Sequence, residues 1–203
     1  MSRVNDIRKA GEYEIIHEMR IGEKEVVVGE LPYDSSQKYL CAFYTENGMI
    51  GAYTESMVSD NYAEIIALYA QRVKDAAEKA QLSLESANVP AEDKKPFDYA
   101  KIHRISFKDS VENAVVVINP DVLRREYRAA IFQLKLCTGG FGSHANARGS
   151  ACYCTDLYTG KTERYERRDI LGTVNEENIP EWAKKNLKDI QKARKEKESR
   201  SSR

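Results

Sequence analysis

The sequence has few of the residues that mark several protein classes. It contains four cysteines, three histidines and one tryptophan among 203 residues. Hydrophobic residues make up 41% and charged residues 32%, which is too apolar for a wholly disordered chain and too charged for a membrane protein. The longest aliphatic run, residues 114–118, is far shorter than the ~20 residues that a membrane-spanning helix requires.

The first residues of the sequence are polar and lack the apolar segment of a secretory signal. We therefore expect a cytoplasmic protein without a membrane partner. Cysteines in that compartment are kept reduced, so a disulfide framework is not expected.

The sequence also lacks a net charge, because 32 Lys and Arg balance 32 Asp and Glu. That balance hides a gradient along the chain. Residues 1–100 carry 11 basic and 18 acidic side chains (net −7), and residues 101–203 carry 21 and 14 (net +7). The neutral total argues against a polyanion-binding protein, whereas the basic second half permits contact with nucleic acid.

Hydrophobic periodicity and turn residues predict an α+β protein with two small antiparallel β-rich halves, each packed by a helix. Residues 1–88 are expected to form an acidic sheet with a long helix, and residues 89–98 a proline-containing linker. Residues 99–191 are expected to form a basic β-rich domain with a Gly-rich loop and a C-terminal helix. Residues 192–203, rich in Lys, Arg, Glu and Ser, are expected to be a disordered tail.

In the first half, strands are predicted at 13–19, 25–29, 39–45 and 49–54. Asn47 and Gly48 favour a tight hairpin turn between the last two, because both tolerate positive φ angles. Asn61 and Glu64 have the spacing of a capping box and predict the start of the long helix.

In the second half, strands are predicted at 99–107, 114–118, 132–137, 151–158 and 161–167. Asn119 followed by Pro120 predicts a short helix through Arg128. Asn178 is expected to cap the final helix.

The Gly-rich loop, residues 138–149, can be aligned with the G-x-G-x-x-A pattern of dinucleotide-binding proteins. That motif requires a helix directly after the glycines, and a strand is predicted instead. A mobile connection between strands is therefore favoured, and no cofactor is expected.

Two kinds of chemistry are conceivable around this loop. Cys137, His144, Cys152 and Cys154 could be zinc ligands, but their spacing is unlike that of structural zinc sites, so no metal is expected. His144 with Arg148 could serve a metal-free nuclease, as an acid or base beside a phosphate-binding guanidinium. One histidine and one arginine are weak grounds for catalysis, and binding is favoured.

Basic side chains interleaved with tyrosines form the candidate binding surface of the second half. Arginine favours planar, bidentate contact with phosphate. An ordinary surface of ion pairs is the alternative, because acidic residues lie adjacent. The candidates are Arg124, Arg125, Arg128, Arg148, Lys161, Arg164, Arg167 and Arg168.

Glutamates gather in the first thirty residues of the chain. Displayed together, they would present a negative field that a nucleic-acid-binding protein could take for phosphate, and a solvated sheet face is the alternative. These residues are Glu12, Glu14, Glu18, Glu23, Glu25 and Glu30.

Several motifs resemble accessory proteins carried on bacterial mobile genetic elements. They are Tyr13-Glu-Ile-Ile-His-Glu-Met, Phe43-Tyr-Thr with Asn47-Gly48, Ser59-Asp-Asn-Tyr62, Cys137-Thr-Gly-Gly-Phe-Gly, Asn146-Ala-Arg-Gly, Asp156-Leu-Tyr-Thr-Gly-Lys-Thr, Arg168-Asp-Ile-Leu-Gly172 and Ile179-Pro-Glu-Trp-Ala183. The resemblance covers most of the chain.

Among such proteins the sequence is most similar to antidefence proteins of the anti-CRISPR type. The resemblance implies an inhibitor that binds the type II RNA-guided DNA nuclease, with its guide RNA or DNA, and blocks cleavage. A nucleic-acid-binding accessory protein of a conjugative element and a guide-RNA nuclease are the alternatives. The resemblance assigns no functional residue.

Overall fold

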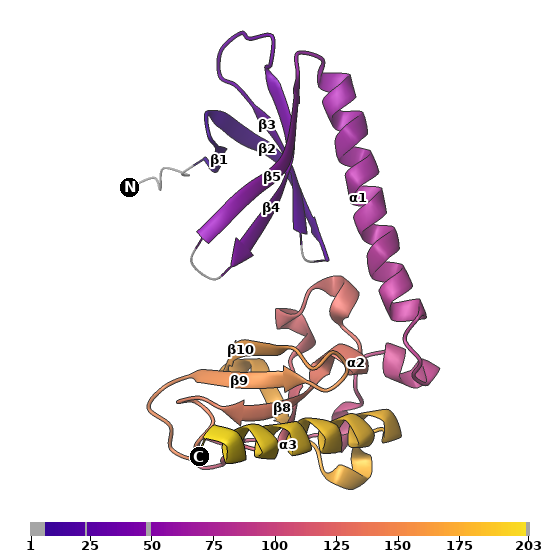
Figure 1. Ribbon diagram of the computed structural model, residues 1–203, viewed down its shortest axis with the longest axis vertical. Helices are drawn as coiled ribbons and strands as arrows, with labels where there is room; N and C mark the ends of the chain where they lie inside the picture. Colours follow the sequence, from indigo (N-terminus) through magenta and orange to yellow (C-terminus); the bar gives the residue numbers. More distant parts are fainter. Residues whose placement is uncertain (1–6, 23, 48–49, 202–203) are drawn as a thin grey trace. The chain divides into compact units, whose positions relative to one another are not determined.

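The computed structural model describes residues 7–22, 24–47 and 50–201 and divides the chain into two compact units (Figure 1). The first unit spans Met1–Ala87 and the second Asn88–Arg203. Each contains an antiparallel sheet and a long helix, so the predicted α+β class is confirmed. The division falls within one residue of the expected end of the acidic domain.

The first unit is built on a five-stranded sheet in which each strand pairs with the next along the chain. Its strands are β1 (Lys9–Ala10), β2 (Tyr13–Ile21), β3 (Lys24–Glu30), β4 (Tyr39–Asn47) and β5 (Ile50–Ser59). The four strands predicted in this half are confirmed. The predicted turn between β4 and β5 includes Gly48, which lies outside the described residues.

One face of this sheet is covered by α1 (Tyr62–Glu85). Val26, Val28 and Cys41 pack against Ile65 of the helix, because alternate residues of a strand face the same side. These side chains form the core that holds the helix on the sheet.

Asn61 caps α1 as predicted, since its side-chain oxygen accepts a hydrogen bond from the N–H of Ala63 at 3.0 Å. The rest of the capping box is not formed. Glu64 accepts from the hydroxyl of Ser59 instead, and that hydroxyl accepts from the N–H of Asn61. The hydroxyl of Ser59 therefore accepts the hydrogen bond from the N–H of Asn61 that the capping-box spacing predicts for Glu64.

The second unit is built on a six-stranded antiparallel sheet with the order β10-β9-β8-β7-β11-β6. Its strands are β6 (His103–Arg104), β7 (Val115–Ile118), β8 (Leu134–Gly139), β9 (Ala151–Asp156), β10 (Thr162–Glu166) and β11 (Ile170–Thr173). The strand predicted at 99–107 is reduced to two residues. β11, which the sequence reading missed, lies between β7 and β6.

Both faces of this sheet are buried by different elements. Alternate residues of β7, Val115 and Val117, pack in one cluster with Ala183 and Leu187 of α3 (Glu181–Ser201). The opposite face carries a second cluster, to which Val116, Ile118 and three cysteines contribute. This second cluster lies beneath the loops that form the candidate site.

One prediction for the second half is corrected by the structure. The expected helix between Asn119 and Arg128 is replaced by two short 3-10 turns, Pro120–Val122 and Arg125–Tyr127.

The described part of α3 extends to Ser201 and so includes most of the stretch expected as a tail, of which residues 202–203 lie outside the described residues. Lys, Arg, Glu and Ala are good helix formers, so this stretch extends a helix that is already anchored by its first turns.

The residues predicted as a linker, 89–98, belong to the second unit. Phe97 is buried, and its N–H donates to the side chain of the fully buried Gln133 in α2 (Ala130–Gln133). Asp93 accepts a hydrogen bond from the indole of Trp182 at 2.9 Å. Among the described residues, no helix is long and apolar enough to cross a membrane.

Candidate nucleic-acid interface

The basic residues singled out from the sequence are distributed over different environments in the second unit. Arg125, Arg148, Lys161, Arg164 and Arg168 are exposed, and Arg124, Arg128 and Arg167 are half-buried. They therefore do not act as a single set.

Arg167 is used to hold loops together. Its guanidinium donates to the carbonyls of Gly142 at 2.6 Å and His144 at 3.4 Å in the Gly-rich loop. It also donates to the carbonyls of Ser106 at 2.9 Å and Asp109 at 2.6 Å. A guanidinium occupied by four carbonyls has little capacity left for phosphate, so the binding role predicted for Arg167 is corrected to a structural one.

Two further arginines are also engaged within the unit. Arg128 donates to the carbonyl of Leu123 and lies beside Asp121, which closes the turn that replaces the predicted helix. Arg164 is paired with Glu166 at 2.6 Å while remaining 55% exposed. Arg125 is exposed on the second 3-10 turn, and Arg124 has a guanidinium nitrogen buried without a hydrogen-bond partner.

The Gly-rich loop is folded tightly against the start of β9. A Cβ atom on Gly140 would lie 2.3 Å from the carbonyl oxygen of Ala151, and one on Gly142 would lie 2.3 Å from that of Ser150. Both positions therefore require glycine. The glycines of this loop allow its backbone to pack directly against the backbone of residues 150 and 151. This geometry does not support the expected mobile connection between strands.

This loop and the segment before β7 border a groove of about 540 Å³. The groove is lined by Ile105, Ser106, Phe107, Ala147, Gly149, Ser150, Glu166, Arg167, Arg168 and Ile170. Arg148 lies in the chain between two of the lining residues. Phe107 is 60% exposed there, and Phe141, whose Cβ approaches Gly149, is 83% exposed.

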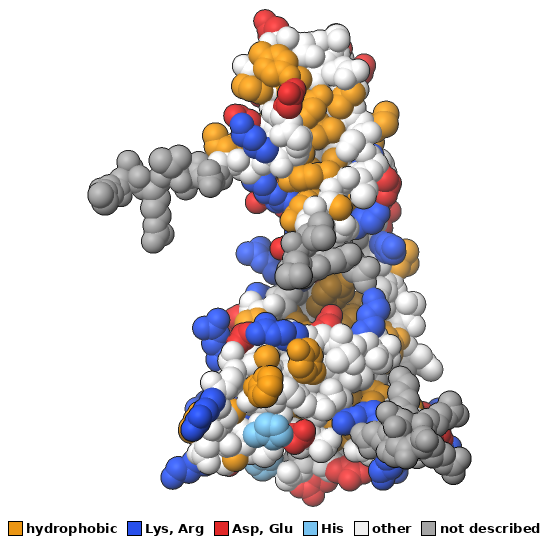
Figure 2. Space-filling model, turned by 60° about the vertical axis from the view of Figure 1, so that its left-hand side comes forward, with side chains coloured by type: hydrophobic (Ala, Val, Ile, Leu, Met, Phe, Trp, Pro, Cys, Tyr) orange, Lys and Arg blue, Asp and Glu red, His pale blue; other side chains and the backbone are white. Residues whose placement is uncertain are grey.

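Figure 2 shows hydrophobic side chains on the visible surface of the second unit, with Lys and Arg side chains nearby. Exposed aromatic rings beside arginines are typical of surfaces that bind nucleobases and phosphates. Phe107 and Phe141 were not singled out from the sequence. Phe141 follows the glycines Gly139 and Gly140, and a large apolar residue in such a loop is the signal that could have identified it.

Three cysteine thiols lie beneath these loops and are fully buried. A hydrogen bond from Cys154 lowers the pKa of Cys137, whereas burial raises the pKa of Cys152 to about 11. No group of three or more His, Cys, Asp and Glu side chains is placed to hold a metal ion in the part of the chain that the structure describes. The thiols contribute to the core and are closed to external substrates.

His144 and Arg148, the pair considered for nuclease chemistry, both lie on the exposed surface of the Gly-rich loop. The imidazole Nδ1 of His144 is 3.3 Å from a carboxylate oxygen of Glu112. This geometry gives the imidazole a carboxylate partner.

The glutamates of the first unit are largely paired with basic side chains. Glu25 and Glu18 both bind Arg8, Glu14 lies 3.5 Å from Lys9, and Glu30 lies 3.8 Å from Lys38. Glu12 accepts a hydrogen bond from Tyr33. Glu23 lies outside the described residues.

The prediction of an exposed acidic surface is wrong for Glu25, because this residue is 7% exposed and its carboxylate lies 2.8 Å from the guanidinium of Arg8. Bound guanidinium and ammonium groups reduce the negative field of the remaining glutamates. The described part of this surface is therefore a poorer imitation of phosphate than the sequence suggests.

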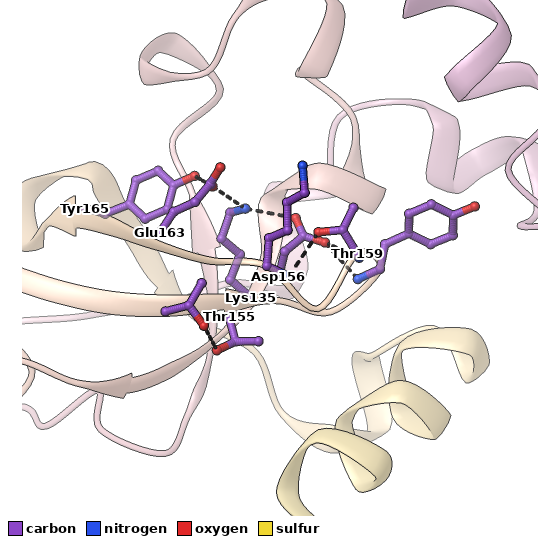
Figure 3. A network of polar contacts seen from close by, with 9 residues as sticks. Lys135, Thr155, Asp156, Thr159, Glu163 and Tyr165 are labelled. Carbon is purple, nitrogen blue, oxygen red and sulfur yellow. Dashed lines mark hydrogen bonds and ion pairs between the residues drawn. The ribbon is translucent and has the colours of Figure 1, made fainter. Parts of the chain in front are cut away.

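A buried polar network ties together the three strands next to the Gly-rich loop (Figure 3). The ammonium of Lys135 on β8 lies 2.9 Å from Asp156 on β9 and 3.1 Å from Glu163 on β10. Tyr165 donates to the same oxygen of Glu163 at 2.6 Å. The side chains of Lys135 and Asp156 are 4% and 5% exposed, so this ion pair is closed to solvent.

The neighbouring groups in this network shift the pKa values of Lys135 and Tyr165. Burial alone would lower the pKa of Lys135, but Asp156, Tyr165 and Glu163 reverse that effect and raise it. Burial and the hydrogen bond to Glu163 raise the pKa of Tyr165. A charged Lys135 and a neutral Tyr165 are therefore the stable forms, and neither is suited to serve as a general base.

Asp156 also organises the turn after β9. Its second oxygen accepts from the N–H groups of Tyr158 at 2.9 Å and Thr159 at 2.7 Å. Sequence reasoning missed this network, although a lysine inside the apolar run Leu134-Lys-Leu-Cys indicates a buried charge that requires a partner.

Comparison of the chain with protein-family models, curated proteins and solved structures gave no match.

Proposed function

We propose that the protein binds nucleic acid through its second unit and acts by binding, without catalysis. The observation that carries this proposal is the groove lined by the exposed residues Arg168 and Phe107, with the exposed residues Arg148 and Phe141 on the Gly-rich loop that borders it. The arginines would contact phosphates, and the rings would contact bases.

The charge of the second unit supports the same proposal. Residues 88–203 carry 23 basic and 17 acidic side chains (net +6), and residues 1–87 carry 9 and 15 (net −6). A net positive unit attracts a polyanion from a distance. Contact with phosphates then displaces the cations condensed on the nucleic acid, which makes such binding sensitive to salt.

Replacing Arg148 and Arg168 together by alanine is expected to weaken binding to RNA and DNA and to make it less dependent on salt. Each phosphate contact contributes roughly 0.7–0.9 to the slope of log K against log salt concentration, so the slope should fall by about 1–2. Fluorescence anisotropy of labelled oligonucleotides over a salt series measures both quantities.

The matched control replaces Lys74 and Lys79, which are exposed on α1 of the first unit. It removes the same charge and is expected to leave the slope unchanged. If both double variants lost the same affinity for nucleic acid, the loss would be due to the net charge of the protein and not to Arg148 and Arg168. Absence of binding by the unmodified protein at low salt would reject the proposed function.

Inhibition of the type II RNA-guided nuclease is a second candidate function. The sequence resemblance favours it, and the groove offers a surface for guide RNA or DNA within that assembly. We expect the protein to co-purify with the guide-loaded nuclease and to block DNA cleavage. Full cleavage in the presence of excess protein would exclude this function.

A further inference from the structure

We infer that the groove is a binding site for single-stranded nucleic acid, with Phe107 as the platform on which one base stacks. The inference rests on the proposed function and specifies the form of the ligand. Its basis is the position of Phe107 on a fixed backbone, the chemistry of the groove around it, and the size of that groove.

Phe107 is exposed although its backbone is held on both sides. Its carbonyl accepts a hydrogen bond from the N–H of Asn146 at 2.8 Å. The carbonyl of the preceding Ser106 accepts from Arg167, and the N–H of Ser106 donates to Asp109 at 2.6 Å. A ring with only two side-chain torsions on an ordered loop loses little conformational entropy when it stacks on a ligand.

The side chains around Phe107 suit the remaining parts of a nucleotide. Arg168 lines the groove and presents an exposed guanidinium for a phosphate. The hydroxyl of Ser106 accepts from the N–H of Lys108 and can donate its own proton to a ligand, whereas Ile105 and Ile170 supply apolar contact. The hydroxyl of Ser150 is hydrogen-bonded to Glu166, a lining carboxylate that is also paired with Arg164. This combination of an aromatic face, a guanidinium and a hydroxyl suits the base, phosphate and sugar of a nucleotide.

A second platform lies at the rim of the same groove. A Cβ atom on Gly149, which lines the groove, would lie 2.7 Å from the Cβ of Phe141. The Cβ of Phe141 therefore lies close to a residue that lines the groove, while 83% of Phe141 is exposed. Two exposed rings next to one groove allow neighbouring bases of a strand to be held in succession.

The size of the groove favours an unpaired strand. A volume of about 540 Å³ lies within the usual range for small-molecule sites and admits a nucleotide. In a duplex, both faces of an internal base are covered by neighbouring base pairs, so an aromatic side chain can stack only on a base that is unpaired. We therefore expect single strands to bind more tightly than a duplex of the same sequence.

The test uses the full chain and fluorescein-labelled RNA and DNA of about 12 nucleotides, each as a single strand and as a duplex. Phe107→Ala is expected to weaken single-strand binding about tenfold, as for the loss of one stacked base, and Phe107→Tyr is expected to retain it. Tyr99→Ala is the control, because Tyr99 is 59% exposed on the same unit and does not line the groove.

The outcomes separate this inference from the proposed function. Equal binding of single strands and duplexes, or equal loss in Phe107→Ala and Tyr99→Ala, would overturn the stacking site while leaving nucleic-acid binding established. Absence of binding to every oligonucleotide would overturn both. The difference between the RNA and DNA arms identifies the preferred strand, and unchanged thermal unfolding of Phe107→Ala shows that its loss of binding is local.

Discussion

Replacing Asp156 by alanine is expected to destabilise the second unit by about 3–5 kcal/mol, because it leaves the ammonium of Lys135 buried without its closest carboxylate. The substitution also removes the acceptor for the N–H groups of Tyr158 and Thr159. Urea unfolding followed by the fluorescence of Trp182 measures this change. That residue is the one tryptophan of the sequence and belongs to the second unit.

Two further variants distinguish the loss of the buried ion pair from the loss of the hydrogen-bond acceptor for the turn after β9. Asp156→Asn keeps an oxygen acceptor for the turn and is expected to lose the charge-dependent part of the stability. Lys135→Met combined with Asp156→Asn removes both charges, keeps an oxygen acceptor for the turn and is expected to be less destabilising than Asp156→Ala, since neither charge of the buried pair stays unpaired. A loss below about 1 kcal/mol in Asp156→Ala would contradict the buried ion pair.

Replacing Arg167 by alanine is expected to destabilise the second unit by about 1.5–3 kcal/mol and to loosen the loops around the groove. Four carbonyls lose a charged donor at once, and they belong to two segments that are far apart in the sequence. Hydrogen exchange should therefore accelerate at the N–H groups of Val111 and Asn146, which donate between these segments.

The neighbouring arginine is the control for this substitution. Arg168→Ala is expected to change stability by less than about 0.5 kcal/mol, because Arg168 is exposed. Arg167→Lys is not expected to restore the wild-type value, since an ammonium cannot reproduce the planar fork of a guanidinium. Unchanged exchange in Arg167→Ala would show that the loops are held by their own backbone contacts. Binding studies should accordingly vary Arg148 and Arg168 and leave Arg167 intact.

The first unit was largely predictable because its structure follows local sequence signals. Apolar and β-branched runs such as Val26-Val-Val28 mark the strands, and each strand pairs with its neighbour in the chain. The cap at Asn61 is likewise a local signal. Pairing of successive strands requires no long-range information beyond the turns.

The second unit was less predictable because distant residues determine its elements. β11 is four residues long, and its pairing with β7 and β6 depends on chain segments far from it in the sequence. The turns from Pro120 to Tyr127 replace a helix whose sequence has an acceptable cap. Tertiary contacts such as those of Arg128 determine the conformation there, and local propensity does not.

The candidate site was predictable in composition and less so in geometry. The sequence identified the basic half, and Arg168 lines the groove while Arg148 lies in the chain between two lining residues. It did not distinguish Arg167, whose role depends on four carbonyls that no pattern marks. Exposure of Phe107 could not be inferred either, since a phenylalanine is usually buried.

The strand orders of the two sheets have a consequence for the order of folding. In the first unit every pairing joins strands consecutive in the chain, so loop closure is short at each step. In the second unit β6 pairs with β11, joining Arg104 to Gly172 and His103 to Thr173. That pairing awaits synthesis of the chain up to Thr173, whereas the first unit is complete at Ala87. The nascent chain can therefore acquire its acidic unit on the ribosome before the groove of the second unit exists.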